Sequence, residues 1–144
     1  MVRINLQGLL YCSHAVLPHL LRAAEDGSRR VADLVNISSL AGRVARNGTA
    51  IYNATKYGVV AFTEALRQEV TGRHVRVSVI EPGVVATEQR SHNRPEIQEQ
   101  ISARFGRIEP LQPANIADAV CFVVTRPRHV AINELLVRPT EQEP

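Results

Sequence analysis

The sequence predicts an α/β protein built on a parallel β-sheet. Three short segments rich in branched apolar residues have the pattern of buried strands, at residues 33–37, 75–80 and 134–137. Longer segments with helical spacing of apolar residues separate them. Strands that alternate with helices favour a parallel sheet made of β-α-β units.

The first half of the chain begins with a helix and continues into a strand. Residues 4–24 predict a buried helix, bent where Pro18 lacks a backbone N–H. A turn at residues 25–28 leads into the first strand, which ends in a second turn at residues 38–42.

A long helix is expected over residues 51–71, with Gly72 as its end. Apolar residues three and four apart mark its core face. These residues are Val59, Phe62, Leu66 and Val70.

The second strand is expected to be stopped by Pro82 and Gly83, which follow it after Glu81. Residues 84–109 are polar and predict a short helix at about residues 95–105. Residues 113–125 predict the last helix, and the tail after Pro139 is expected to fray. The inward side of the last helix is expected to carry Ile116, Val120 and Val123 or Val124.

Length and composition indicate one ordinary globular domain spanning residues 1–144. The net charge is +3, but the basic residues are spread along the chain and only 4% of residues are aromatic, which argues against nucleic acid as a partner. Cys12 and Cys121 fit reduced core residues, and the histidines show no metal-ligand spacing. No signal peptide or membrane-spanning stretch is recognisable, so we expect a cytoplasmic protein.

The chemistry of the chain is expected around Tyr52 and Lys56, which lie one helical turn apart on the same face. A free phenol titrates near ~10, and bringing its pKa to about 7 takes roughly 4 kcal/mol of differential stabilisation. A neighbouring ammonium in a dry site can supply this energy. Ser39 on the preceding turn could hold a carbonyl oxygen within reach of that phenol. The pattern therefore suggests proton transfer to or from an alcohol or a carbonyl.

These residues resemble the short-chain dehydrogenase/reductase family. The resemblance rests on Tyr52-x-x-x-Lys56 with a serine thirteen residues before the tyrosine, on an asparagine upstream, and on a Pro-Gly exit from the following strand. It covers nearly the whole chain and implies a partial Rossmann-like doubly wound parallel sheet with only the C-terminal strands and helices. The ending, Arg138-Pro139-Thr140, is similar to a subset with 3-hydroxy acid, serine and clavaldehyde dehydrogenases.

The resemblance implies a role for each residue of the site. Tyr52 would be the general acid or base, Lys56 would lower its pKa and bind the nicotinamide ribose, and Ser39 would bind the substrate oxygen. Ser38 is the rival to Ser39 and is expected to help form the turn. Asn5 would hold a water that links Lys56 to solvent. The remaining cofactor contacts would come from Pro82, Gly83, Val85 and Thr87. The family resemblance also implies that the segment 84–109 would be a mobile substrate lid.

The resemblance also implies NADP or NAD as cofactor, with NADP favoured by the subset. The substrate would be a small alcohol or carbonyl compound, and the intact protein would be a homo-oligomer, a dimer or a tetramer. Substrate identity and the choice between NAD and NADP are not fixed by the sequence.

The glycine-rich turn that binds the cofactor pyrophosphate in this family is missing, because none of the eight glycines forms such a cluster. We therefore expect the C-terminal part of such an enzyme, produced by a late start codon or a degenerate gene, and inactive alone. The alternative is a non-catalytic dimerisation module that uses helices 4–24 and 51–71, with an open strand edge at residues 33–37. A sugar-nucleotide epimerase or dehydratase is a minor third possibility.

Overall fold

A computed structural model of the chain describes residues 1–87, 98–99, 103 and 105–143. Three strands form a parallel sheet in the order β1-β2-β3. The strands are β1 (Ala32–Ile37), β2 (Val75–Pro82) and β3 (Glu134–Val137). The α-helices are α1 (Leu9–Asp26), α2 (Ala50–Val70) and α4 (Pro113–Val124). The expectation of an α/β fold with a parallel sheet is confirmed.

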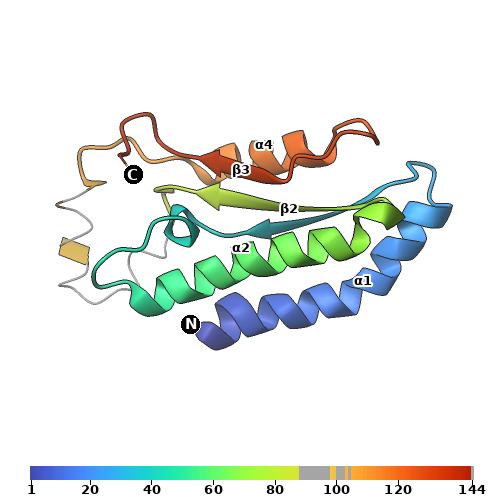
Figure 1. Cartoon of the computed structure of the whole chain (residues 1–144). Helices are drawn as coiled ribbons and strands as arrows, with labels where there is room; N and C mark the ends of the chain where they lie inside the picture. The colour runs from blue at the N-terminus through green and yellow to red at the C-terminus, as the bar shows by residue number, and fades with distance from the viewer. Residues whose placement is uncertain (88–97, 100–102, 104, 144) are drawn as a thin grey trace.

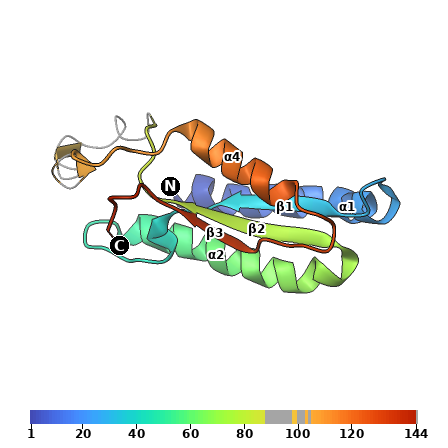
Figure 2. The same ribbon diagram turned by 90° about the horizontal axis from the view of Figure 1, so that it is seen from above.

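The sheet is covered on both faces. Helices α1 and α2 lie on one face and α4 lies on the other, as Figures 1 and 2 show together. Every residue of the central strand β2 is buried, which requires cover from both sides. The core between β2 and the pair α1 and α2 is made of aliphatic side chains. Its buried members are Ala24, Ala32, Leu66, Val70, Val75 and Val77.

Three short turns of other helical types accompany these elements. A π-helical turn, η1 (Arg3–Gly8), leads directly into α1, which continues across Pro18. The turns η2 (Leu40–Gly42) and η3 (Thr71–Arg73) are 3₁₀-helical. Asn5 lies in η1, a π-helical turn, and this helix geometry is frequent at functional sites.

The core face expected for α2 is largely confirmed, since Val59, Leu66 and Val70 are buried and Phe62 packs against the core. Gly72, however, does not end the helix. The chain passes through η3, and it is His74 that takes the left-handed conformation, with φ 58°. The hydrogen bond from the His74 backbone N–H to Thr71 O closes this turn, so no glycine is required there.

Two further expectations need correction. Cys12 and Cys121 are free thiols, but both are exposed rather than core residues, because each lies on the outer side of its helix. Within the described part of the tail, residues 140–143, the expected fraying is not seen at Gln142, which is only 6% exposed and donates its backbone N–H to Pro139 O. Most of the expected helix at residues 95–105 lies outside the described residues. None of the described helices is long and apolar enough to cross a membrane.

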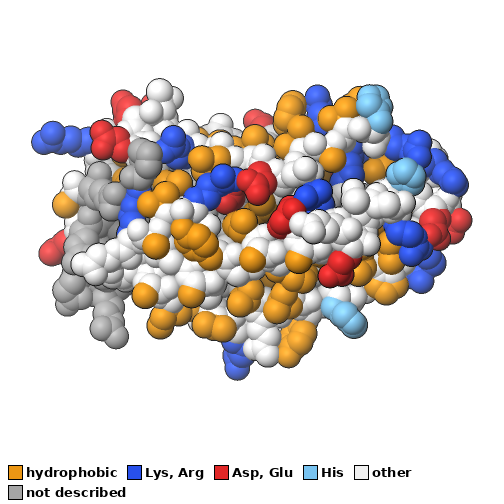
Figure 3. Space-filling model, viewed as in Figure 1, with side chains coloured by type: hydrophobic (Ala, Val, Ile, Leu, Met, Phe, Trp, Pro, Cys, Tyr) orange, Lys and Arg blue, Asp and Glu red, His pale blue; other side chains and the backbone are white. Residues whose placement is uncertain are grey.

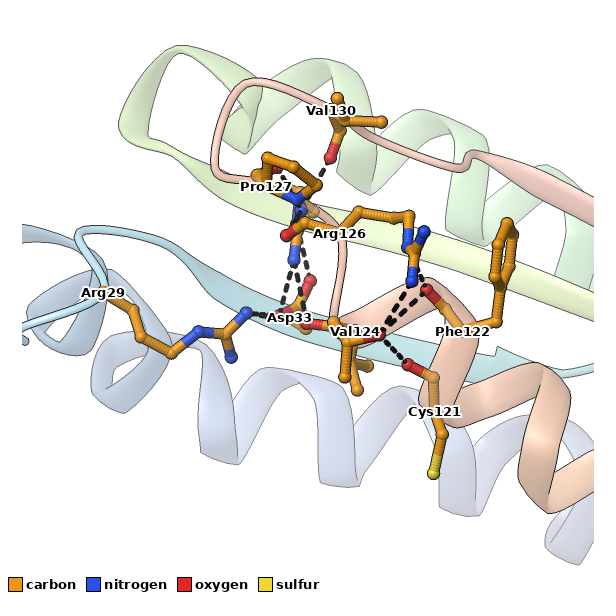
Figure 4. A network of polar contacts seen from close by, with 10 residues as sticks. Arg29, Asp33, Cys121, Phe122, Val124, Arg126, Pro127 and Val130 are labelled. Carbon is orange, nitrogen blue, oxygen red and sulfur yellow. Dashed lines mark hydrogen bonds and ion pairs between the residues drawn. The ribbon is translucent and has the colours of Figure 1, made fainter.

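A buried ion pair joins β1, β2 and the end of α4 at the amino end of the sheet. Asp33 and Arg76 lie side by side in the register of β1 and β2, and both Asp33 oxygens accept from the Arg76 guanidinium, at 2.7 and 3.0 Å. Figure 4 shows Asp33 among the carbonyls of the segment that follows α4. Arg76 also donates to the carbonyls of Val124, Arg126, Pro127 and Val130. This network fixes the end of α4 against the sheet.

Candidate active site

The expected site residues meet at the carboxyl end of the sheet, where β1 and β2 end and α2 begins. They line one cavity of about 710 Å³. All eight of the expected residues are among its walls: Asn5, Ser39, Tyr52, Lys56, Pro82, Gly83, Val85 and Thr87. Open α/β sheets bind their ligands at this end of the strands. The side of α4 that faces the sheet completes the cavity with Pro113, Ile116, Ala117 and Val120.

Tyr52 and Lys56 occupy successive turns at the start of α2, and both are half-buried. Lys56 Nζ lies 5.9 Å from the centre of the Tyr52 ring and donates to the carbonyl of Ile37 at 3.1 Å. Burial lowers the pKa of Lys56 below the ordinary lysine value, because desolvation disfavours the ammonium. The end of β1 therefore holds the ammonium beside the phenol.

The two adjacent serines have different surroundings. Ser38 is buried and its hydroxyl donates to Lys56 O at 2.9 Å, which ties the turn to α2. Ser39 caps η2 by accepting from the Ala41 backbone N–H at 3.2 Å. Gly42 leaves room for the hydrogen bond of Ser38, since a Cβ there would lie 2.7 Å from Ser38 Oγ and 3.0 Å from Lys56 O. Ser39 donates to no described residue, so its hydroxyl hydrogen is available in the cavity.

Asn5 reaches the start of α2 from η1. Its Nδ2 lies 3.5 Å from Thr55 Oγ1, and Thr55 in turn donates to Tyr52 O at 2.8 Å. Asn5 lines the same cavity as Lys56. No direct hydrogen bond joins these two side chains, so a link between them needs an intervening group such as a water molecule.

The segment after β2 is held in place by its backbone. Gly83 N donates to Val137 O of β3 at 2.7 Å, and Val84 and Ala86 exchange hydrogen bonds with Leu111. Val85 pairs with Leu111 in an isolated parallel bridge. This arrangement presents Val85 and Thr87 to the cavity.

A second, smaller cavity of about 270 Å³ is also lined by Tyr52. The two cavities share Ser39, Tyr52, Pro82 and Gly83. The phenol and the Ser39 hydroxyl therefore stand at the junction of two spaces, and a group in either one can reach them. Among the described residues, no three histidines, cysteines, aspartates or glutamates gather as metal ligands would.

The sequence matches the model of the short chain dehydrogenase family over residues 1–98. The chain belongs to this family. An uncharacterized oxidoreductase of Staphylococcus saprophyticus is 34% identical over 99% of this chain and 56% of its own length. Human dehydrogenase/reductase SDR family member 11 is 33% identical over 99% of this chain and 55% of its own.

The fold agrees with this assignment. The closed form of serine dehydrogenase complexed with NADP+ superposes with a TM-score of 0.84 at 33% identity, over 99% of this chain and 56% of that chain. The present chain thus spans about half the length of the relatives that it matches.

Asn53 is a site residue of this short chain dehydrogenase that the sequence argument missed. It follows Tyr52 directly, is buried, and its Nδ2 donates to Ala41 O and Val44 O at 2.7 and 3.0 Å. Its Oδ1 accepts from the Thr49 hydroxyl. Asn53 therefore holds the loop of residues 41–49 in place by hydrogen bonds, and this loop forms much of the wall of the smaller cavity. The position of Asn53 between Tyr52 and Lys56 was the one feature of the sequence that pointed to it. Sequence spacing does not predict that its amide is buried and donates to loop carbonyls.

Glu81 was also missed. It is fully buried just before Pro82, and Arg43 Nε donates to it at 2.5 Å. Burial raises the pKa of Glu81, and the hydrogen bond from Arg43 opposes that rise. Because Arg43 also pairs with Glu134 of β3, the three side chains join η2 to the two strands beside the site.

Proposed function

We propose that this site is the proton-transfer and nicotinamide half of an NAD(P)-dependent oxidoreductase that interconverts an alcohol and a carbonyl. The observation that carries the proposal is the position of Tyr52, one helical turn from a desolvated Lys56 and at the junction of two cavities. Family membership and the solved relative with NADP+ support the same assignment.

The larger cavity fits the nicotinamide end of such a cofactor. Its volume of about 710 Å³ lies within the ~300–1,000 Å³ common for small-molecule sites. Lys56 would bind the ribose, and Val85 and Thr87 would bind the carboxamide. When bound, the cofactor supplies or accepts the hydride.

The residues of the chain would handle the proton and the oxygen. In reduction, Tyr52 Oη would give its proton to the substrate oxygen, which the Ser39 hydroxyl would hold by donating to it. The Lys56 ammonium would stabilise the phenolate that remains. A water molecule beside Asn5 would return the proton by way of Lys56.

The 144 residues are expected not to turn over the cofactor alone, because the sequence has no glycine cluster for the pyrophosphate. The test compares the 144-residue chain with a chimera that places the N-terminal half of a serine dehydrogenase relative before Met1. Both are incubated with NADPH or NADH and a panel of aldehydes and ketones, and absorbance of the reduced cofactor is followed. We expect oxidation by the chimera only. A folded chimera that is inactive with every substrate contradicts the oxidoreductase proposal, and activity of the 144-residue chain contradicts its dependence on the missing turn.

A second candidate function is self-association through α1 and α2. Figure 3 shows hydrophobic side chains along the face that these helices form. Large apolar side chains exposed on η1, α1 and α2 include Ile4, Tyr11, Ile51 and Tyr57. Exposed apolar surface of this kind marks interaction sites.

Self-association predicts a dimer that charge on this face would disrupt. In sedimentation velocity, the unmodified chain is expected to sediment as a dimer or larger species. Tyr11→Lys combined with Ile51→Glu is expected to give a monomer with unchanged circular dichroism. The matched control is Phe122→Lys, which charges an exposed aromatic position on α4 and should leave the dimer intact. A monomeric unmodified chain would exclude this role.

A further inference from the structure

Gln142 brings the C-terminal tail into the site. Figure 1 shows the C-terminus at the same end of the sheet as the carboxyl ends of the strands. The tail turns at residues 140–141, and Gln142 as a whole residue is only 6% exposed. It lines the smaller cavity together with Ser39 and Tyr52.

The orientation of the Gln142 amide follows from its one partner. The Val84 backbone N–H lies 2.8 Å from Oε1, and a backbone N–H can only donate. The oxygen must therefore face Val84, which leaves the NH₂ group at the other end of the amide. That NH₂ group, Nε2, makes no hydrogen bond to any residue in the described part of the chain.

A close approach at Gly83 makes this position possible. A Cβ at Gly83 would lie 2.2 Å from Gln142 Oε1, so only glycine lets the amide reach the backbone there. The contact fixes the amide beside Gly83, a residue that lines both cavities, although Gln142 itself lines only the smaller one. Nε2 is not fully buried, so an acceptor on a ligand in the smaller cavity can reach it.

We propose that Gln142 is a substrate-binding residue whose Nε2 donates to an oxygen of the substrate other than the reacting carbonyl. That the ligand is a carbonyl compound rests on the function proposed above. The site then favours carbonyl compounds that carry a second oxygen acceptor, because a plain ketone offers no acceptor to Nε2.

The first test observes the amide itself and needs no turnover. Acetoacetate and butanone differ by a carboxylate in place of a methyl group, and each is titrated into the ¹⁵N-labelled 144-residue chain. The side-chain NH₂ resonances of Gln142 are assigned by their absence in Gln142→Met. We expect acetoacetate to shift them saturably in the millimolar range and butanone to leave them in place. No shift with acetoacetate overturns the proposal, whether or not the protein proves to be an oxidoreductase.

Two variants separate binding from a structural role. Gln142→Glu keeps an oxygen for the Val84 N–H and removes the donor, whereas Gln142→Met removes both. We expect the Val84 amide to stay protected from hydrogen exchange in Gln142→Glu, while acetoacetate binds at least about tenfold more weakly in both variants. If Gln142→Glu binds acetoacetate as well as the unmodified chain does, Gln142 only supports the backbone and the proposal is wrong.

Discussion

Replacing Tyr52 with phenylalanine is expected to lower kcat of the active chimera by at least about a hundredfold, since positioned acid–base catalysis contributes roughly 10²–10⁴. The substitution removes one oxygen atom and keeps the ring beside Lys56. Among the described residues, Ser39 is the only other one that lines both cavities and has a side-chain proton donor. The measurement is steady-state oxidation of the reduced cofactor, with its Kd from fluorescence titration.

The matched control is Tyr57→Phe. Tyr57 lies on the same helix, and its hydroxyl donates to Arg43 O rather than lining either cavity. This variant should keep kcat within a few-fold of the unmodified chimera. Comparable turnover in Tyr52→Phe and Tyr57→Phe, with cofactor binding retained in both, would remove Tyr52 from the mechanism.

Much of the architecture was predictable because it rests on local patterns. The alternating apolar residues of β2 and the spacing of Val59, Leu66 and Val70 on α2 reflect burial, which sequence periodicity reports directly. The gathering of the site residues was predictable for a similar reason. Parallel strands end at one edge of a sheet; Ser39 follows β1, and Pro82 is the last residue of the neighbouring strand β2.

The parts that escaped prediction depend on contacts between distant segments. Gln142 looked like a residue in a frayed tail because nothing in its neighbourhood shows that Val84 N–H lies beside it. His74 replaces Gly72 in the left-handed conformation because a 3₁₀ turn intervenes, and the geometry of a helix end is weakly encoded. The placement of Asp33 opposite Arg76 depends on strand register, which single-strand patterns do not specify.

That ion pair gives the second large expected effect, on stability. Arg76→Met is expected to lower the free energy of unfolding by about 3–5 kcal/mol, the usual cost of removing one partner of a buried pair. Both side chains are nearly inaccessible, at 7% and 8%, so solvent cannot replace the lost guanidinium. Arg29 lies 3.4 Å from Asp33 but is 56% exposed, which makes it a weak substitute. The measurement is urea denaturation of the 144-residue chain followed by circular dichroism.

Companion variants decide whether the loss belongs to this network. Arg73→Met breaks an ion pair with Glu25 in which both side chains are about half exposed, and it should change the unfolding free energy by no more than about 1 kcal/mol. Arg76→Lys keeps a charge for Asp33 but loses the planar guanidinium, which also donates to the carbonyls of Val124 and Val130. Its unfolding free energy should therefore lie between those of Arg76→Met and the unmodified chain. Adding Asp33→Leu to Arg76→Met removes the carboxylate that has lost its buried partner, and should restore part of the lost unfolding free energy. Equal destabilisation by Arg73→Met and Arg76→Met would mean that the buried Asp33–Arg76 pair stabilises the fold no more than the exposed pair does.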